Sequence, residues 1–112
     1  MQVTKEKDGD TLIMVLTGRL DSTTSSDFEK QIVAAIHDNE KHIVIDLDQV
    51  DYISSAGLRA ILIGAKQMNA GYGKLALCGL SEKIEEVFHM SGFDKILKIF
   101  PTRSDAIAAV SG

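Results

Sequence analysis

The sequence predicts a single α/β domain with a mixed, mostly parallel β-sheet and about four helices. The chain has 112 residues, which suffices for one hydrophobic core and is too short for two. Turn residues recur at regular intervals between apolar segments. One of these segments, residues 12–16, is apolar on both faces, as expected of a strand in a sheet that helices cover on both sides.

The first three predicted elements are two strands and a helix. An Asp-Gly-Asp turn at residues 8–10 is typical of a β-hairpin and joins strands near residues 3–7 and 12–17. Small polar residues that favour helix starts follow, and Ser26 with Glu29 three positions later fits a capping box. The apolar residues at helical spacing after this box are Phe28, Ile32, Ala35 and Ile36.

Three strand–helix pairs complete the chain, in the overall order β-β-α-β-α-β-α-β-α. The strands are expected at residues 42–47, 75–78 and 96–100, where apolar residues are concentrated. The helices after them are expected to begin at residues 54–57, at Ser81, and at Thr102 or Ser104. Each strand–helix–strand unit should form a right-handed parallel crossover, which gives a mixed sheet with a hairpin at its start.

Composition indicates a folded cytoplasmic protein. Hydrophobic residues make up 45% of the chain and charged residues 25%, so the chain can bury enough apolar surface to offset its conformational entropy. The net charge of −4 argues against nucleic acid or an anionic membrane as the main partner. The single cysteine cannot form an internal disulfide, and the N-terminus lacks the apolar segment of a signal peptide. No apolar run approaches the ~20 residues needed to span a bilayer.

No pattern of residues indicates a catalytic or metal site, and no cofactor is expected. His37, His42 and His89 fall on different elements without metal-ligand spacing, and helix-end or surface roles are expected for them. Cys78 lies in an apolar strand, which favours a buried core residue over a nucleophile. The acidic residues after the third strand are Asp46, Asp48 and Asp51. Loop solvation and local capping are favoured for them over a cation site, because they lack the ligand spacing of a calcium loop.

Ser54 and Ser55 stand at a predicted helix start, just after a strand and a loop. Backbone N–H groups are unsatisfied there and the helix dipole is positive, so a phosphate would be accepted without unfolding the helix. Phosphorylation would add about −1.5 to −2 charges and repel a partner surface shaped for a neutral hydroxyl. On these grounds alone, simple capping by the serines, at ~1 kcal/mol, is the favoured alternative. A catalytic serine is less well supported, because the segment is not a Gly-x-Ser-x-Gly elbow and no histidine is placed to act as its base.

The outer face of this second helix offers a candidate docking surface. Arg59, Ile63 and Lys66 lie at three- and four-residue steps, away from the core positions. Ala60 and Gly64 form a stripe of small residues beside them, where another surface could approach closely. Two alternatives stay open for Ile63, namely exposure in a docking patch and packing under a neighbouring loop.

Residues 50–62, Val-Asp-Tyr-Ile-Ser-Ser-Ala-Gly-Leu-Arg-Ala-Ile-Leu, resemble the signature of anti-sigma factor antagonists, which are STAS domains. Three other segments resemble parts of the same family: residues 16–21 its second strand and following loop, 43–47 its central strand, and 88–93 the end of its third helix. The resemblance covers nearly the whole chain in order, so residues 1–112 are expected to form one STAS domain.

The resemblance implies a bacterial partner switch. In this family the unphosphorylated protein binds an anti-sigma factor, itself a serine kinase, and so frees a sigma factor. The kinase uses ATP to phosphorylate the antagonist and is thereby released, and a phosphatase resets the switch. The family's acceptor serine lies two residues before its glycine, which places it at Ser55. Ser54 stands where many members have Asp and is the less favoured acceptor, and Ala56 stands where some members carry a second hydroxyl.

The expected partner surface and one competing hypothesis follow from this resemblance. The surface comprises Asp21, Ser54, Ser55, Ala56, Gly57, Arg59, Ala60 and Ile63. The competing hypothesis is a STAS domain that serves as a structural subunit of a lipid-transport or stress-signalling complex, in which phosphorylation has no role. A neighbouring gene for a serine kinase would favour the switch, and neighbouring genes for transporter parts would favour the structural subunit.

Overall fold

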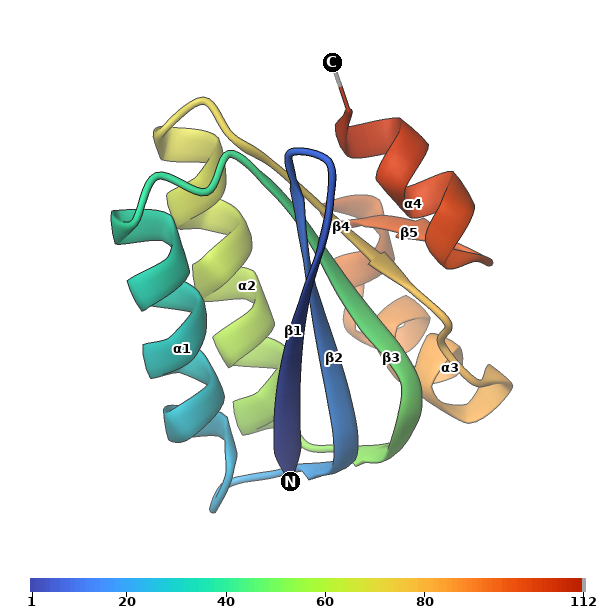
Figure 1. Ribbon diagram of the computed structural model, residues 1–112. Coiled ribbons are helices and arrows are strands. Elements are labelled where there is room, and N and C mark those ends of the chain that lie inside the picture. Colours follow the sequence, from blue (N-terminus) through green and yellow to red (C-terminus); the bar gives the residue numbers. More distant parts are fainter. Residues whose placement is uncertain (112) are drawn as a thin grey trace.

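Within residues 1–111, which the computed structural model describes, five strands form one mixed β-sheet in the order β1-β2-β3-β4-β5 (Figure 1). The strands are β1 (Gln2–Asp8), β2 (Thr11–Leu20), β3 (His42–Ile53), β4 (Lys74–Cys78) and β5 (Lys98–Phe100). β1 runs antiparallel to β2, and the other neighbouring strands are parallel. The predicted hairpin and mixed sheet are confirmed. Gly9 in the hairpin turn has a φ of +59°, which glycine adopts at no steric cost.

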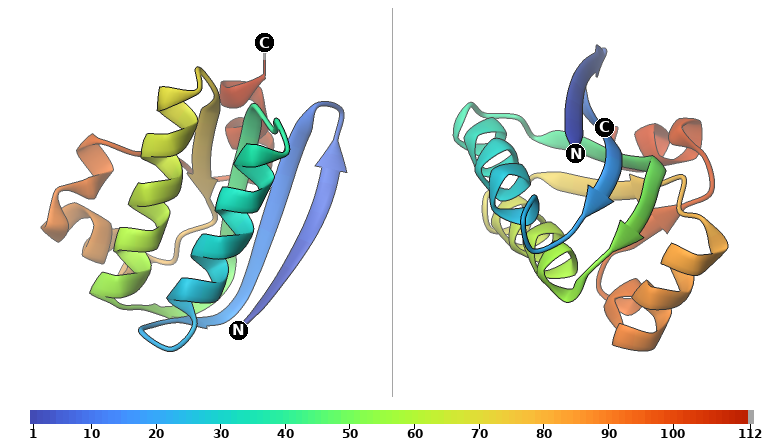
Figure 2. Two further views of the ribbon diagram at one scale, coloured as in Figure 1. Left: turned by 90° about the vertical axis from the view of Figure 1, so that its left-hand side faces the viewer. Right: turned by 90° about the horizontal axis from the view of Figure 1, so that it is seen from below.

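The described part of the chain also forms four α-helices. They are α1 (Ser25–His37), α2 (Ser55–Ala70), α3 (Glu82–Ser91) and α4 (Arg103–Val110), with a short 3₁₀ helix, η1 (Phe93–Lys95), after α3. α1 and α2 lie side by side on one face of the sheet, and α4 covers the opposite face (Figures 1 and 2). The order of strands and helices is the predicted one.

The side chains of β2, β3 and β4 alternate between two hydrophobic cores, as the two-residue period of a strand requires. Ile43, Ile45 and Leu47 of β3 contribute to the larger core, which α1 and α2 cover. α3 adds Ile84 and Phe88 to this core. The smaller core lies beneath α4 and consists of Ile13, Val44, Ala76, Cys78, Ala106 and Val110. α2 therefore packs over the larger core, and its N-terminus lies beside the carboxyl end of β3.

Three strand boundaries differ from the prediction. β2 and β3 pair as far as Leu20 and Ile53, well beyond the predicted ends at residues 17 and 47, and they do so across two shifts of register. Exposed polar residues in this stretch, such as Arg19 and Asp51, interrupt the apolar pattern, so an apolar run does not mark the full length of these strands. β5 begins at Lys98 and is shorter than the predicted segment.

The expectation of loop solvation is wrong for Asp46. The residue is 7% exposed, and its Oδ2 accepts hydrogen bonds from Arg103 Nε at 3.0 Å and Nη2 at 2.8 Å. Its Oδ1 accepts a bond from the Asp48 N–H at 3.0 Å. Hydrogen bonding to Asp46 raises the pKa of Arg103, which also reaches Glu6 Oε1 at 3.2 Å. Asp46 therefore ties α4 to the sheet, whereas Asp48 and Asp51 are exposed on the same strand.

The predicted capping box at the start of α1 is wrong. The N-cap residue is Thr24 rather than Ser26, and no side-chain hydrogen bond caps this helix. Thr24 Oγ1 instead donates to the Arg19 carbonyl at 2.8 Å and accepts from the Asp21 N–H at 2.9 Å. Its hydroxyl is thus used within the loop between β2 and α1, which leaves Ser26 and Glu29 on the surface of the first turns.

Candidate functional site

The start of α2 separates the roles of Ser54 and Ser55. Ser54 is the N-cap residue: its Oγ accepts a hydrogen bond from the Gly57 N–H at 3.2 Å, and its own N–H donates to the Leu20 carbonyl at 2.9 Å. Ser55 is the first residue of the helix and is exposed. None of the side-chain hydrogen bonds among residues 1–111 involves its hydroxyl. The helix start predicted at residues 54–57 is confirmed, and Ser55 carries the hydroxyl that a partner can reach.

Gly57 holds this helix start against the end of β2. A Cβ on Gly57 would lie 2.6 Å from the Leu20 carbonyl oxygen, 2.9 Å from Leu20 Cγ and 3.0 Å from Ile53 Cγ1. Only glycine permits such a close approach without moving the backbone. Gly57 is buried, so it supports the partner surface through the position of the helix start, and its own predicted contact with a partner stays a prediction.

The small-residue stripe of α2 faces α1 of the same chain. Ala60 is 1% exposed, and a Cβ on Gly64 would lie 2.5 Å from Ile32 Cδ1 of α1. The close approach that the stripe suggested is therefore made within the molecule. Ala60 therefore presents almost no surface to a partner in this structure, and its predicted contact with a partner stays a prediction.

A shallow hollow of about 470 Å³ lies between the N-terminal halves of α1 and α2. Its residues are Ser25, Ser26 and Glu29 of α1 and Ser55, Ala56, Arg59 and Ile63 of α2. On α2, Ser55, Arg59 and Ile63 are spaced four residues apart and so share one face of the helix. Ile63 is half-buried and borders this hollow. Four of the predicted surface residues are thus brought together in one place.

The α1 wall of the hollow escaped sequence reasoning. The sequence pattern predicts a capping role for Ser26 and Glu29. Their proximity to Ser55 depends instead on how α1 packs against α2. No local pattern in the sequence specifies that packing. The available signal was the stripe of small residues on α2, which indicates a close helix–helix contact.

The charge distribution around Ser55 favours an added negative charge on α2. The first turn of α2 contains no acidic residue, so the positive end of the helix dipole has no counter-charge there. Arg59 lies one turn further along, is exposed, and takes part in no ion pair within the described residues. On the facing helix, Glu29 is half-buried and contributes a negative charge to the same hollow.

Asp21 fixes the loop that leads into α1. Its Oδ1 accepts hydrogen bonds from the Thr23 N–H at 3.0 Å and the Thr23 hydroxyl at 2.7 Å, which lower the pKa of Asp21. Its Oδ2 lies 3.6 Å from Arg19 Nε, and the Arg19 guanidinium lies 4.2 Å from the centre of the Tyr52 ring. Asp21 does not line the hollow of Ser55 in this structure, and its predicted contact with a partner stays a prediction.

Cys78 is buried, and His42 and His89 contact other residues of the chain, as expected of residues with a structural role. Cys78 is 1% exposed, and burial together with the nearby Asp46 carboxylate raises the pKa of its thiol to about 12, so little nucleophilic thiolate forms at neutral pH. His89 Nδ1 lies 2.8 Å from an oxygen of Asp94, and His42 Nδ1 contacts the Val110 carbonyl. Across residues 1–111, no three His, Cys, Asp or Glu side chains are grouped to hold a metal ion. Over the same residues, no helix is long and apolar enough to cross a bilayer.

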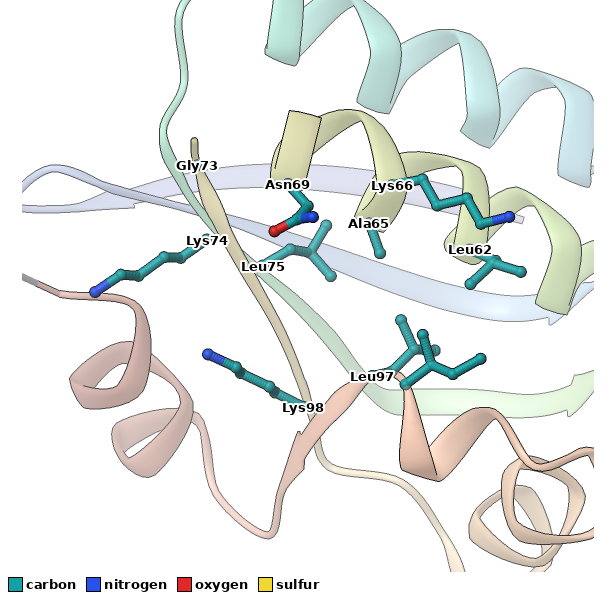
Figure 3. A pocket seen from close by; sticks show the side chains of 10 residues that line it. Leu62, Ala65, Lys66, Asn69, Gly73, Lys74, Leu75, Leu97 and Lys98 are labelled. Atoms are coloured by element: carbon teal, nitrogen blue, oxygen red, sulfur yellow. The ribbon is translucent and has the colours of Figure 1, made fainter. Parts of the chain in front are cut away.

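A second pocket, of about 350 Å³, lies on the other flank of α2, between that helix, the start of β4 and the segment leading into β5 (Figure 3). It shares no lining residue with the hollow of Ser55. No local sequence pattern predicts this pocket, because three separate segments form it.

Comparison with known proteins identifies the family of this fold. The family profile described as the STAS domain matches residues 2–106. The chain is 39% identical over 109 residues to BtrV of Bordetella bronchiseptica, a candidate anti-sigma factor antagonist, which covers 97% of this chain and 94% of the relative. It is 32% identical over 108 residues to an anti-sigma F factor antagonist of Paenibacillus polymyxa, which covers 96% of this chain and 92% of that protein.

Solved structures agree with these relatives. A crystal structure of a candidate anti-sigma factor antagonist from Thermotoga maritima superposes with a TM-score of 0.92 at 26% identity, covering 96% of this chain and 93% of that one. The family resemblance and the fold class derived from the sequence are both confirmed.

Proposed function

The chain belongs to the STAS domain family, and on that premise we propose that it is an anti-sigma factor antagonist whose binding is switched off by phosphorylation of Ser55. The proposal describes a regulatory protein of the cytoplasm rather than an enzyme. Its partners are an anti-sigma factor with serine kinase activity, which the unphosphorylated form binds so that a sigma factor is freed, and a phosphatase that acts on the phosphorylated form.

The exposed, unbonded hydroxyl of Ser55 is the observation that carries the proposal. A kinase must reach the acceptor hydroxyl, and the hydroxyl must be free of hydrogen bonds within the protein. Ser55, at the first position of α2, meets both requirements. Ser54 is a poorer acceptor, because its Oγ already accepts the capping bond from Gly57. Modification of Ser54 would remove that cap, whereas modification of Ser55 leaves it in place.

The surroundings of Ser55 support a switch that leaves the fold unchanged. A phosphate at the first helical position meets free backbone N–H groups and the positive end of the dipole. It also introduces about −1.5 to −2 charges into a hollow whose present lining is serine hydroxyls, Arg59 and Glu29. A partner surface that fits the neutral hydroxyl then has to take this charge out of water, and burying an unpaired charge is costly.

The proposal is tested by incubating the protein with ATP and the serine kinase encoded nearest to it, followed by intact mass and peptide mapping. One added phosphate on Ser55 is expected, absent from Ser55→Ala and retained in Ser54→Ala. Phosphate on Ser54 would keep the mechanism and move the acceptor by one residue. No phosphate, with the kinase active on another substrate, would contradict the switch and favour a structural-subunit role.

A further inference from the structure

The pocket on the second flank of α2 has an apolar floor. Leu75 of β4 and Leu97 before β5 are 8% and 6% exposed, and Leu62 of α2 lies beside them (Figure 3). Ile96 also borders the pocket and is 64% exposed, so its side chain is accessible to a ligand there. At about 350 Å³, the pocket falls in the size range of small-molecule sites, which are mostly apolar with a few polar groups.

The rim of this pocket is positively charged. Its charged residues are Lys66, Lys74 and Lys98, with no acidic residue among the lining. Neither α2, nor β4, nor residues 96–100 contain a single Asp or Glu, although the chain as a whole carries a net charge of −4. Within residues 1–111, none of the three lysines forms an ion pair. The concentration of unpaired cations therefore runs against the overall charge of the protein.

Two of these lysines are placed at one end of the pocket by the sheet. Lys98 pairs with Ala76, so Lys74 is its diagonal neighbour on the adjacent strand, within reach of long side chains. Both side chains extend toward the same side in Figure 3, away from the leucines. β5 pairs with β4 only from Ala76 onward, so at Lys74 and Leu75 β4 pairs with β3 on one side and has no strand on the side toward β5. Because no strand covers this side of β4, the pocket is open to both faces of the sheet. It is therefore lined by the leucines of one face and by Lys74 and Lys98 of the other.

We propose that this pocket binds a small aliphatic anion, at a site separate from the phosphorylation switch. The carboxylate or phosphate group lies between Lys74 and Lys98, and the aliphatic chain lies on the leucine floor. The lining contains no aromatic side chain on which a base could stack, so an aliphatic body fits the pocket better than a nucleotide.

The head-group requirement is tested with the unmodified protein. Decanoate, decyl phosphate, decanol and decyltrimethylammonium are titrated below their micelle concentrations into ¹⁵N-labelled protein. Decanoate and decyl phosphate are expected to give saturable shifts centred on the amides of Leu62, Leu75 and Leu97. Decanol should bind at least about tenfold more weakly and the cationic amphiphile should not bind, because the lysines select the anion. Equal binding of all four compounds, or shifts centred on the exposed Met1 and Met90, would overturn the proposal.

Two variants separate the charge from the floor. The double variant Lys74→Glu/Lys98→Glu is expected to weaken decanoate binding by about tenfold or more. Its matched control, Lys30→Glu/Lys83→Glu, makes the same charge change on exposed residues of α1 and α3 and should bind as the parent does. Ala65→Phe, which fills the half-buried wall of the pocket, should abolish binding while leaving phosphorylation of Ser55 intact. Unchanged affinity in both the double variant and Ala65→Phe would refute the site.

Discussion

The two flanks of α2 differ in what they offer to solvent. The flank that faces α1 carries hydroxyls, one arginine and one glutamate around a shallow hollow. The flank that faces β5 carries leucines and lysines around a deeper pocket without an acid. The first set suits a protein surface and a covalent charge, and the second suits a small apolar anion. A single helix can therefore serve two separate binding events, since the two sites share no lining residue.

The largest expected effect is the loss of kinase binding when a negative charge is placed on the flank of α2 that carries Ser55, with ligand binding on the other flank unchanged. Ser55→Asp should weaken binding to the cognate kinase by about 2–4 kcal/mol, because a negative charge enters the hollow where the partner fits a neutral hydroxyl. Ser55→Ala should bind as the parent does, and calorimetric titration gives both values. Ser104→Asp places the same charge in the first turn of α4, on the other face of the sheet, and is the matched control. Equal binding by Ser55→Asp and Ser55→Ala would remove Ser55 from the switch, and loss of decanoate binding in Ser55→Asp would contradict the independence of the flanks.

A second comparison concerns the two glycines that set α2 in place. Gly57→Ala should lower the free energy of unfolding by about 1–3 kcal/mol, because the new methyl group meets the backbone oxygen of Leu20, which cannot move alone. Gly64→Ala meets the flexible end of Ile32, and alanine gains up to about 1 kcal/mol in helix propensity over glycine, so its net effect should be much smaller. Urea unfolding of both variants measures the difference. A larger loss in Gly64→Ala than in Gly57→Ala would show that the contact between α1 and α2 holds the helix more firmly than the contact with β2.

The element order and the helix start at Ser54 could be predicted because both depend on local signals. The hairpin turn specifies the first strand pair, and a serine before an apolar helical pattern specifies a cap. The hollow and the pocket depend on which segments meet, and neither meeting is encoded in a short window of sequence. Ala60 and Gly64 illustrate this, since a stripe of small residues is compatible with an outer face and with a contact between helices, and the packing of α1 decides between them.

Polar residues in long strands caused the remaining errors. β3 continues past its apolar segment at residues 43–47. In this continuation Asp48, Gln49 and Asp51 are exposed, and only Val50 and Ile53 reach the core, so the apolar pattern is interrupted. The register shifts in the ladder with β2 break the simple alternation that pattern reasoning requires. The burial of Asp46 has a different origin, because its partner Arg103 lies far away in the sequence and no local pattern pairs the two residues.

A third prediction distinguishes the two adjacent serines. Ser54→Ala should cost about 1 kcal/mol of stability, because the Gly57 N–H loses its capping acceptor. Ser55→Ala should change stability by no more than about 0.5 kcal/mol, because its hydroxyl has no hydrogen-bond partner among the described residues. Chemical denaturation gives the two values, and the phosphorylation assay gives the opposite ranking. If the stability losses were reversed, Ser55 would be the structural serine and the acceptor would have to be sought at Ser54.

The smallest expected effect tests how Arg59 responds to the phosphate. Ser55 and Arg59 are four residues apart on one helix face, the spacing at which opposite charges on a helix attract by about 0.2–0.5 kcal/mol. The cation favours the doubly charged phosphate, so it lowers the second pKa of phosphoserine 55. Arg59→Gln should raise that pKa by about 0.3 of a unit in a ³¹P titration, since one unit corresponds to about 1.4 kcal/mol. Lys66→Gln removes an equal charge about three turns from Ser55 on the same helix and should leave the titration unchanged. Equal titrations in parent and Arg59→Gln would mean that the arginine stays free to contact the partner after phosphorylation, and that the added charge alone drives release.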